Sequence, residues 1–154
     1  MRKSIILISI GLLFIVSSCN SGNAGKSTTN TSSASGSVIV LTNDLFKKQI
    51  FDYEINKQWK FEGSLPVIID FYADWCGPCR QLSPRVEEIA KKYAGKIVVY
   101  KVNTDEEKIL AQNMGIQSLP TLLFIPLKGQ PQATMGALPT ETLEKAIREV
   151  LLVN

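Results

Sequence analysis

The stretch Trp75-Cys76-Gly77-Pro78-Cys79 decides the fold and the chemistry that this sequence predicts. Residues 67–72, just before it, form a nearly continuous apolar run that is typical of a strand buried on both faces. Residues 82–93, just after it, repeat apolar side chains at helical spacing. Two cysteines three positions apart at the start of a helix face the same way and can close a disulfide. The helix dipole and its unpaired N–H groups favour negative charge on Cys76, whose pKa is expected to be lowered.

The two cysteines are expected to play different parts. Cys79 lies one turn into the predicted helix, so it should be more shielded than Cys76 and remain a thiol until it is needed. Cys76 would attack a substrate disulfide to give a mixed disulfide, which Cys79 then attacks to release the reduced substrate. A structural disulfide, or half of a metal site shared with another chain, is the alternative interpretation of the pair.

Outward from this stretch, the apolar pattern predicts alternating strands and helices. Strands are expected at residues 38–41, 67–72, 97–102, 121–125 and 133–135. Helices are expected over residues 46–53 and 82–93, from a capping box at residues 104–107, and from about residue 140. The order βαβαβαββα indicates an α/β fold, in which parallel strands are followed by an antiparallel pair and helices cover both faces of a mixed sheet. Pro84 predicts a kink in the second helix.

Asp70 interrupts the buried run of residues 67–72. Burial of a carboxylate disfavours its charged form, so the pKa of Asp70 should be raised. A carboxylate of this kind can accept the proton of Cys79, through a water molecule, as Cys79 becomes the nucleophile. The alternative is an aspartate with a purely structural role.

The sequence Trp75-Cys76-Gly77-Pro78-Cys79 resembles the active site of the thioredoxin family, and the resemblance runs across nearly all of residues 38–154. It implies the thioredoxin fold and a thiol–disulfide oxidoreductase that acts on disulfide-containing proteins as a monomer. Lys101 is similar to the family's lysine that pairs with the buried aspartate and tunes it. Tyr72 departs from the tryptophan that many members of the family carry at this place.

The resemblance also implies a substrate groove. Leu119-Pro120-Thr121 is similar to the family's cis-proline loop, which lies against the disulfide and exposes the backbone of Leu119 to a substrate segment. Gly136 resembles the glycine of the groove. The side chain of Trp75, beside the reactive thiol, is expected to form contact surface. The residues expected in the groove are Trp75, Gly77, Pro78, Leu119, Pro120 and Gly136.

The first nineteen residues have the pattern of a targeting sequence. Arg2 and Lys3 form a positive start, and residues 5–16 form an apolar run of 12 residues, which is too short to span a membrane. Residues 16–19, which end in Cys19, resemble the lipobox of bacterial lipoproteins. The resemblance implies a signal peptide at residues 1–18 and lipid on the sulfur of Cys19, with the protein in the cell envelope on the periplasmic side of the inner or outer membrane. An ordinary secreted protein is the alternative.

Residues 20–37 contain only Asn, Ser, Gly, Ala, Thr and one Lys. Without large apolar side chains this segment cannot bury enough surface to fold, which predicts a flexible linker. A coil of 18 residues has a typical reach of roughly 23 Å. The expected organisation is therefore a signal peptide at 1–18, a lipidated cysteine and linker at 19–37, and a thioredoxin domain at 38–154. Gly25-Lys26-Ser27 lacks the remaining features of a phosphate-binding loop, so no nucleotide site is expected.

Composition excludes several classes of function. The chain has no histidine, which excludes a Ser/His/Asp triad and any zinc site that uses histidine. Without the predicted signal peptide, 15 basic and 14 acidic residues leave a net charge of +1, which gives no indication of a nucleic-acid partner. Two cysteines supply only half of a tetrahedral zinc site, so neither a metal nor an organic cofactor is expected.

The direction of the reaction is predicted less directly. Family members with Gly-Pro between the cysteines are usually reductants, whereas oxidising relatives commonly carry a histidine there. Disulfides persist outside the cytosol, so a reductant in that place requires electrons from a membrane thiol-reducing protein. The sequence therefore favours a disulfide reductase. An oxidase or isomerase, or a binding module that acts as a chaperone without redox chemistry, are the alternatives.

Overall fold

The computed structural model describes residues 36–61 and 63–154. The predicted signal peptide, the predicted lipidation site Cys19 and linker residues 20–35 lie outside the described residues. Among the described residues, no helix combines the length and the apolar character that crossing a bilayer requires.

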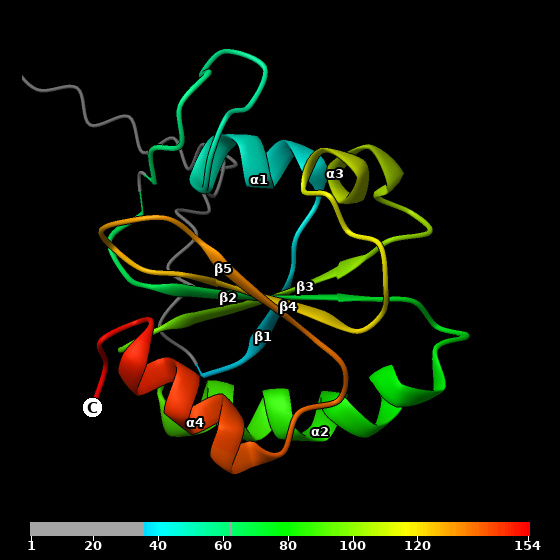
Figure 1. Cartoon of the computed structure of the whole chain (residues 1–154), viewed down its shortest axis with the longest axis vertical. Helices are drawn as coiled ribbons and strands as arrows, with labels where there is room; N and C mark the ends of the chain where they lie inside the picture. Colours follow the sequence, from blue (N-terminus) through cyan, green and yellow to red (C-terminus); the bar gives the residue numbers. More distant parts are fainter. Residues whose placement is uncertain (1–35, 62) are drawn as a thin grey trace, which may run out of the picture.

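A mixed sheet of five strands forms the centre of the molecule (Figure 1). The strands are β1 (Val38–Val40), β2 (Val67–Tyr72), β3 (Val98–Asn103), β4 (Thr121–Ile125) and β5 (Gln132–Met135). They lie in the order β1-β3-β2-β4-β5. The first three are parallel, and β4 and β5 add an antiparallel pair. The predicted order of elements and the mixed sheet are therefore confirmed.

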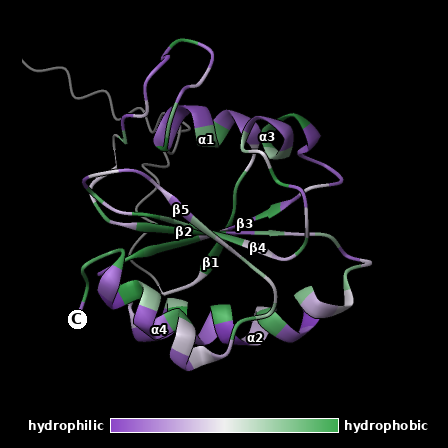
Figure 2. Ribbon diagram, in the orientation of Figure 1, coloured by the Kyte–Doolittle hydropathy of each residue, from purple (hydrophilic) through white to green (hydrophobic). Residues whose placement is uncertain are grey.

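Helices cover both faces of this sheet. The helices α1 (Asn43–Gln49) and α3 (Lys108–Asn113) lie on one face, and α2 (Gly77–Lys92) and α4 (Thr140–Glu149) lie on the other (Figure 1). Each face has its own cluster of buried apolar side chains. Figure 2 shows the hydrophobic colouring along the central strands and the hydrophilic colouring on much of α1. Burial on both faces explains why β2 lacks the polar alternation of a half-exposed strand.

The first helix is shorter than the sequence predicts. The spacing of Phe46, Ile50 and Tyr53 predicts one helix through all three residues, but α1 ends at Gln49 and Ile50 caps it. Tyr53 instead follows the helix and folds back, so that its ring packs 6.2 Å from that of Phe46 and its hydroxyl donates to the side chain of Asn43. The apolar spacing therefore reflects a shared core and not one continuous helix.

The predicted capping box at residues 104–107 is wrong, because α3 begins only at Lys108. The hydroxyl of Thr104 donates to the carbonyl of Tyr72 at 3.2 Å and does not cap a helix. Residues 104–106 form turns directly after β3, where Asn103 Oδ1 accepts from the N–H of Asp105 at 3.0 Å. The carboxylate of Glu107 accepts from the N–H of Asn43 at 3.0 Å and so ties this turn to the start of α1.

The strand directions place the redox pair at one end of the molecule. The helix α2 opens five residues after β2 ends at Tyr72, and it continues through Pro84 to Lys92. The Cys76–Cys79 segment therefore lies beyond the carboxyl edge of β2, which is a common place for active sites in α/β sheets. The opposite edge carries the starts of β1, β2 and β3 and the end of β4.

Candidate redox site

Cys76 and Cys79 form a disulfide across the first turn of α2, with their Cα atoms 5.3 Å apart. Cys76 is the N-cap residue of the helix, and its Sγ accepts from the N–H of Cys79 at 3.2 Å. The N–H of Cys76 donates to the carbonyl of Ala73 at 3.1 Å, which fixes the turn that leads out of β2. After reduction, the same helix N–H groups stabilise a thiolate at Cys76.

The expected difference in shielding between the two cysteines is wrong for the oxidised state. Cys76 is 3% exposed and Cys79 is 4% exposed, so access to solvent does not separate them. Their surroundings do. Cys76 caps the helix, whereas Cys79 lies within it and lines a cavity of about 190 Å³ that also contains the side chain of Asp70.

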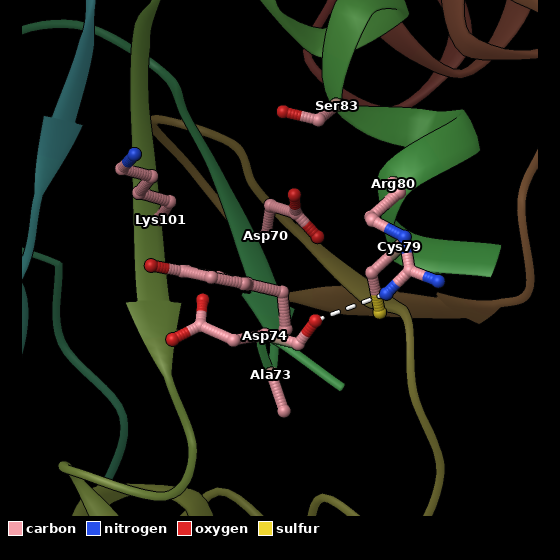
Figure 3. A pocket seen from close by; sticks show the side chains of 8 residues that line it. Asp70, Ala73, Asp74, Cys79, Arg80, Ser83 and Lys101 are labelled. Atoms are coloured by element: carbon pink, nitrogen blue, oxygen red, sulfur yellow. Dashed lines mark hydrogen bonds between the residues drawn. The ribbon is translucent and has the colours of Figure 1, made fainter. Parts of the chain in front are cut away.

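This cavity lies between β2, β3 and α2 (Figure 3). Asp70 extends from β2 on the side of α2, and its strand neighbour across the ladder is Lys101 of β3. Arg80 lines the outer part of the cavity, where its Nη1 donates to the carbonyl of Asp74 at 3.1 Å. Ser83, one turn further along α2, also lines the cavity, so α2 contributes the polar side chains of Arg80 and Ser83 as well as Cys79.

Asp70 is only 5% exposed, and its Oδ1 has no hydrogen-bond partner in the part of the chain that the structure describes. Burial raises the pKa of Asp70 to about 7, and the positive charge of Lys101 opposes part of that rise. The predicted pairing with Lys101 is therefore electrostatic. Among the described ion pairs none joins these two side chains, and the Lys101 ammonium lies 5.8 Å from the ring centroid of Tyr72.

Of the residues that the sequence predicted for a substrate groove, Leu119 lies against the disulfide, and a hydrogen bond links Gly136 to Pro120. The peptide bond between Leu119 and Pro120 is cis, and Leu119 packs against the buried cluster that contains both cysteines. The N–H of Gly136 donates to the carbonyl of Pro120 at 2.8 Å. Gly136 has a φ of 95°, which favours glycine over residues with a Cβ. Gly77 and Pro78 open α2 between the two cysteines.

Trp75 presents apolar surface next to the reactive pair. Its side chain is 70% exposed, and its Nε1 donates to Asp105 Oδ2 at 2.9 Å. This bond holds the indole against the turn that follows β3. Met135, next to Gly136 on β5, is 69% exposed.

Comparison with known proteins agrees with this geometry. The family model described as Thioredoxin matches residues 37–149. The chain belongs to the thioredoxin family. A thioredoxin from Borreliella burgdorferi is 48% identical over 111 residues, which cover 72% of this chain and 95% of the relative. A chloroplastic M-type thioredoxin from Spinacia oleracea is 43% identical over 62% of this chain, which spans only 52% of that relative.

The fold agrees as well. The crystal structure of a thioredoxin from Malassezia sympodialis matches with a TM-score of 0.60 and 37% identity, over 74% of this chain and 90% of that structure. The chain therefore has the thioredoxin fold, and it is a thioredoxin-type thiol–disulfide oxidoreductase whose reactive pair is Cys76 and Cys79. Among the described residues, no cluster of acidic, cysteine or histidine side chains could hold a metal ion.

Several supporting residues were not found from the sequence. Arg85 donates from Nη1 to the carbonyls of Ala137 (3.2 Å) and Leu138 (2.9 Å), which directly follow Gly136. It thereby joins α2 to the loop that carries the groove glycine. The hydroxyl of Thr121 donates to the carbonyl of Ser118 at 2.7 Å and fixes the loop on the other side of Pro120. No sequence signal distinguishes Arg85 from the other basic residues of the helix.

Asp70 makes the stability of the oxidised protein depend on pH. Its pKa is about 7 in the fold and 3.8 in the unfolded chain. Only the folded state binds this proton between those values, so the free energy of unfolding should fall as the pH rises from about 4 to about 7. In the wild type this fall should be on the order of 4 kcal/mol between pH 4 and pH 8. The variant Asp70→Asn should not show it, because asparagine does not titrate. Urea unfolding at both pH values measures it. The matched variant Asp44→Asn on exposed α1 should retain the fall, and parallel profiles for wild type and Asp70→Asn would contradict the prediction.

Arg85 should position the groove without taking part in the chemistry. Arg85→Met keeps much of the volume but removes both bonds to the groove loop, so KM for a protein disulfide should rise about tenfold, equivalent to about 1.4 kcal/mol. The kcat should change little, because Arg85 does not line the cavity beside Cys79. Steady-state reduction of insulin disulfides measures both constants. Arg148→Met on α4 is the matched control, and an unchanged KM in Arg85→Met would show that the loop holds its shape without the arginine.

Proposed function

We propose that this chain is a lipid-anchored extracytoplasmic thioredoxin that reduces disulfides in proteins of the cell envelope. The observation that carries the thiol–disulfide exchange is the position of Cys79, between Cys76 at the helix N-terminus and the cavity that it shares with the buried carboxyl of Asp70. The pKa of about 7 lets this carboxyl accept or release a proton near neutral pH.

The reaction proceeds in two exchanges. The thiolate of Cys76 attacks one sulfur of the substrate disulfide, and the other substrate sulfur leaves as a thiolate that takes up a proton. Asp70 then accepts the proton of Cys79 through a water molecule, with Lys101 lowering the pKa of the carboxyl. Cys79 attacks the sulfur of Cys76, and the second substrate sulfur leaves as a thiolate that takes up the proton accepted by Asp70 or an equivalent proton from solvent. The substrate gains two electrons and two protons, while the Cys76–Cys79 disulfide forms.

The groove would hold the substrate segment during both exchanges. The backbone of Leu119, which precedes Pro120, is available for β-type pairing with an extended segment. Trp75 supplies exposed apolar surface on one side of the disulfide, and Gly136 leaves room on the other. Gly77 and Pro78 keep the face of the helix turn above the disulfide free of large side chains.

The direction and the location rest on the sequence. Gly77 and Pro78 lie between the cysteines where oxidising relatives of the family commonly carry a histidine, and this favours reduction. Residues 1–19 support a lipid anchor at Cys19, with at least two acyl chains needed for stable attachment. The spinach relative is named as chloroplastic, so the proposed location depends on this chain's own residues. A membrane thiol-reducing protein would then supply electrons.

The roles of the cysteines can be separated by trapping. Cys79→Ser should accumulate a mixed disulfide between Cys76 and an oxidised substrate protein, whereas Cys76→Ser should form none, because only Cys76 starts the exchange. Asp70→Asn, which retains Cys79, should prolong the lifetime of this mixed disulfide by about a hundredfold, the lower end of the range expected for loss of a general base. Non-reducing gels with quenched time points measure all three. Equal trapping by both serine variants would contradict the assignment, and a chaperone-like activity that survives replacement of both cysteines would indicate a second role that does not depend on the redox pair.

The direction follows from the reduction potential of the Cys76–Cys79 pair. Equilibration of the protein with dithiothreitol or glutathione buffers should give a value near about −270 mV, the range of reducing thioredoxins. The oxidised protein should also be re-reduced by membranes of its source organism. A value near about −120 mV, the range of a strong oxidant, would instead indicate a disulfide oxidase.

A further inference from the structure

We propose that the end of the domain opposite the redox pair is a membrane-docking surface that lies on anionic lipid. The surface is a groove of about 490 Å³, which we call the distal groove, lined among others by Leu65, Lys96, Leu127, Lys128, Leu152 and Val153. The proposal rests on the lipid attachment proposed above. It adds to that attachment a defined orientation of the domain on the membrane.

The position of the distal groove follows from the strand directions. Leu65 precedes β2 and Lys96 precedes β3, so both lie at the edge where the parallel strands begin. Leu127 and Lys128 follow β4, which is antiparallel to β2 and therefore ends at the same edge. The chain after α4 brings Leu152 to this edge as well. Cys76 follows the other end of β2, so the groove and the redox pair lie at opposite ends of the sheet.

The side chains of the distal groove combine apolar surface with positive charge. Leu127 is 49% exposed and Leu152 is 79% exposed, and both line the same groove, so they form one apolar patch. Lys96 and Lys128 lie among them, and no acidic side chain is among the described residues that line the groove. Lys96 donates to the backbone oxygen of Asn154 at 2.5 Å, which fixes its position, and Lys128 adds a second positive charge to the groove. Leucines enter the acyl boundary of a bilayer, and lysines interact with anionic headgroups.

The path of the chain indicates a membrane as the occupant. β1 is parallel to β3 and begins with Val38 opposite Val99, so the chain enters the domain at the edge that carries the distal groove. Gly36 packs against the end of α2, where an added Cβ would lie 3.0 Å from the Cβ of Ala94. The linker predicted from the sequence has a reach of roughly 23 Å. A lipid on Cys19 would therefore keep this edge, and not the redox edge, near the bilayer.

Docking in this orientation turns the redox site outward. The groove loops around Pro120 and Gly136 would face the compartment that holds the substrate proteins. The exposed indole of Trp75 would face away from lipid, so its apolar surface would remain available to substrates.

Hydrogen–deuterium exchange tests the proposal on the full chain, isolated with its lipid and reconstituted into vesicles. The amides of residues 127–129 and 151–153 should exchange about tenfold more slowly in vesicles that contain phosphatidylglycerol than in pure phosphatidylcholine vesicles. The amides of residues 74–80 should exchange alike in both. The variant Lys128→Glu/Leu152→Asn should lose the difference; asparagine suits the φ of 56° at position 152.

The matched control is Lys108→Glu/Ile109→Ser, which makes similar changes on exposed α3 at the redox end and should behave as wild type. Equal exchange in the two kinds of vesicle, or protection that follows protein concentration and not lipid, would overturn the docking surface. The mass of the Cys19 peptide and flotation with vesicles report the anchor separately. A chain without lipid at Cys19 would overturn the attachment, and with it this proposal, while the reductase chemistry would be unaffected.

Discussion

The central strand β2 is the constraint on which the rest of the structure depends. It is hydrogen-bonded to β3 on one side and β4 on the other, and helices bury both of its faces. A strand in this position has no edge and almost no freedom of register, since a slip by one residue would reverse every side chain. Its register puts Asp70 opposite Lys101 and delivers the chain to Cys76 in a fixed direction. The register and direction of β2 therefore determine where the residues of the redox site lie.

The same strand explains the energetic character of the site. Five of its six residues are buried, and one of these is the carboxyl of Asp70. A fold selected for stability alone would place an apolar side chain there, because burial of a carboxyl without full pairing is unfavourable. Asp70, with its pKa raised to about 7, lines the same cavity as Cys79, and the proposed proton transfer would make use of this otherwise unfavourable burial.

Much of the fold and of the redox centre could be predicted from the sequence, because local patterns carried them. The apolar run of residues 67–72 and the cysteine pair at a helix start identify β2 and the start of α2 without knowledge of distant contacts. The cis-proline loop and Gly136 came from resemblance to a family. The capping box at residues 104–107 and the helix through Tyr53 failed because tertiary contacts overrode local propensity. Thr104 binds the carbonyl of Tyr72, which is 32 residues away in the sequence.

Arg85 and the shielding of the cysteines could not be predicted for a related reason. The carbonyls that Arg85 binds are more than 50 residues away, and a main-chain acceptor leaves no trace in the side-chain pattern. The near equality of the two cysteine exposures depends on how Leu119 and Ala73 pack around the disulfide, which only the assembled fold determines. The cysteine pair could be identified from a local sequence motif. Arg85 could not, because it acts through contacts with backbone groups that are distant in the sequence.

The two tryptophans give the molecule two optical probes that report on different things. Trp75 is 70% exposed and adjoins the disulfide, so dissolved quenchers reach its indole and a bound substrate would exclude them. Trp59 is half-buried in the segment between α1 and β2, where its ring lies 4.8 Å from that of Phe51. Its emission reports the packing of that segment. Intrinsic fluorescence can therefore distinguish occupancy of the groove from loosening of the scaffold without any added label.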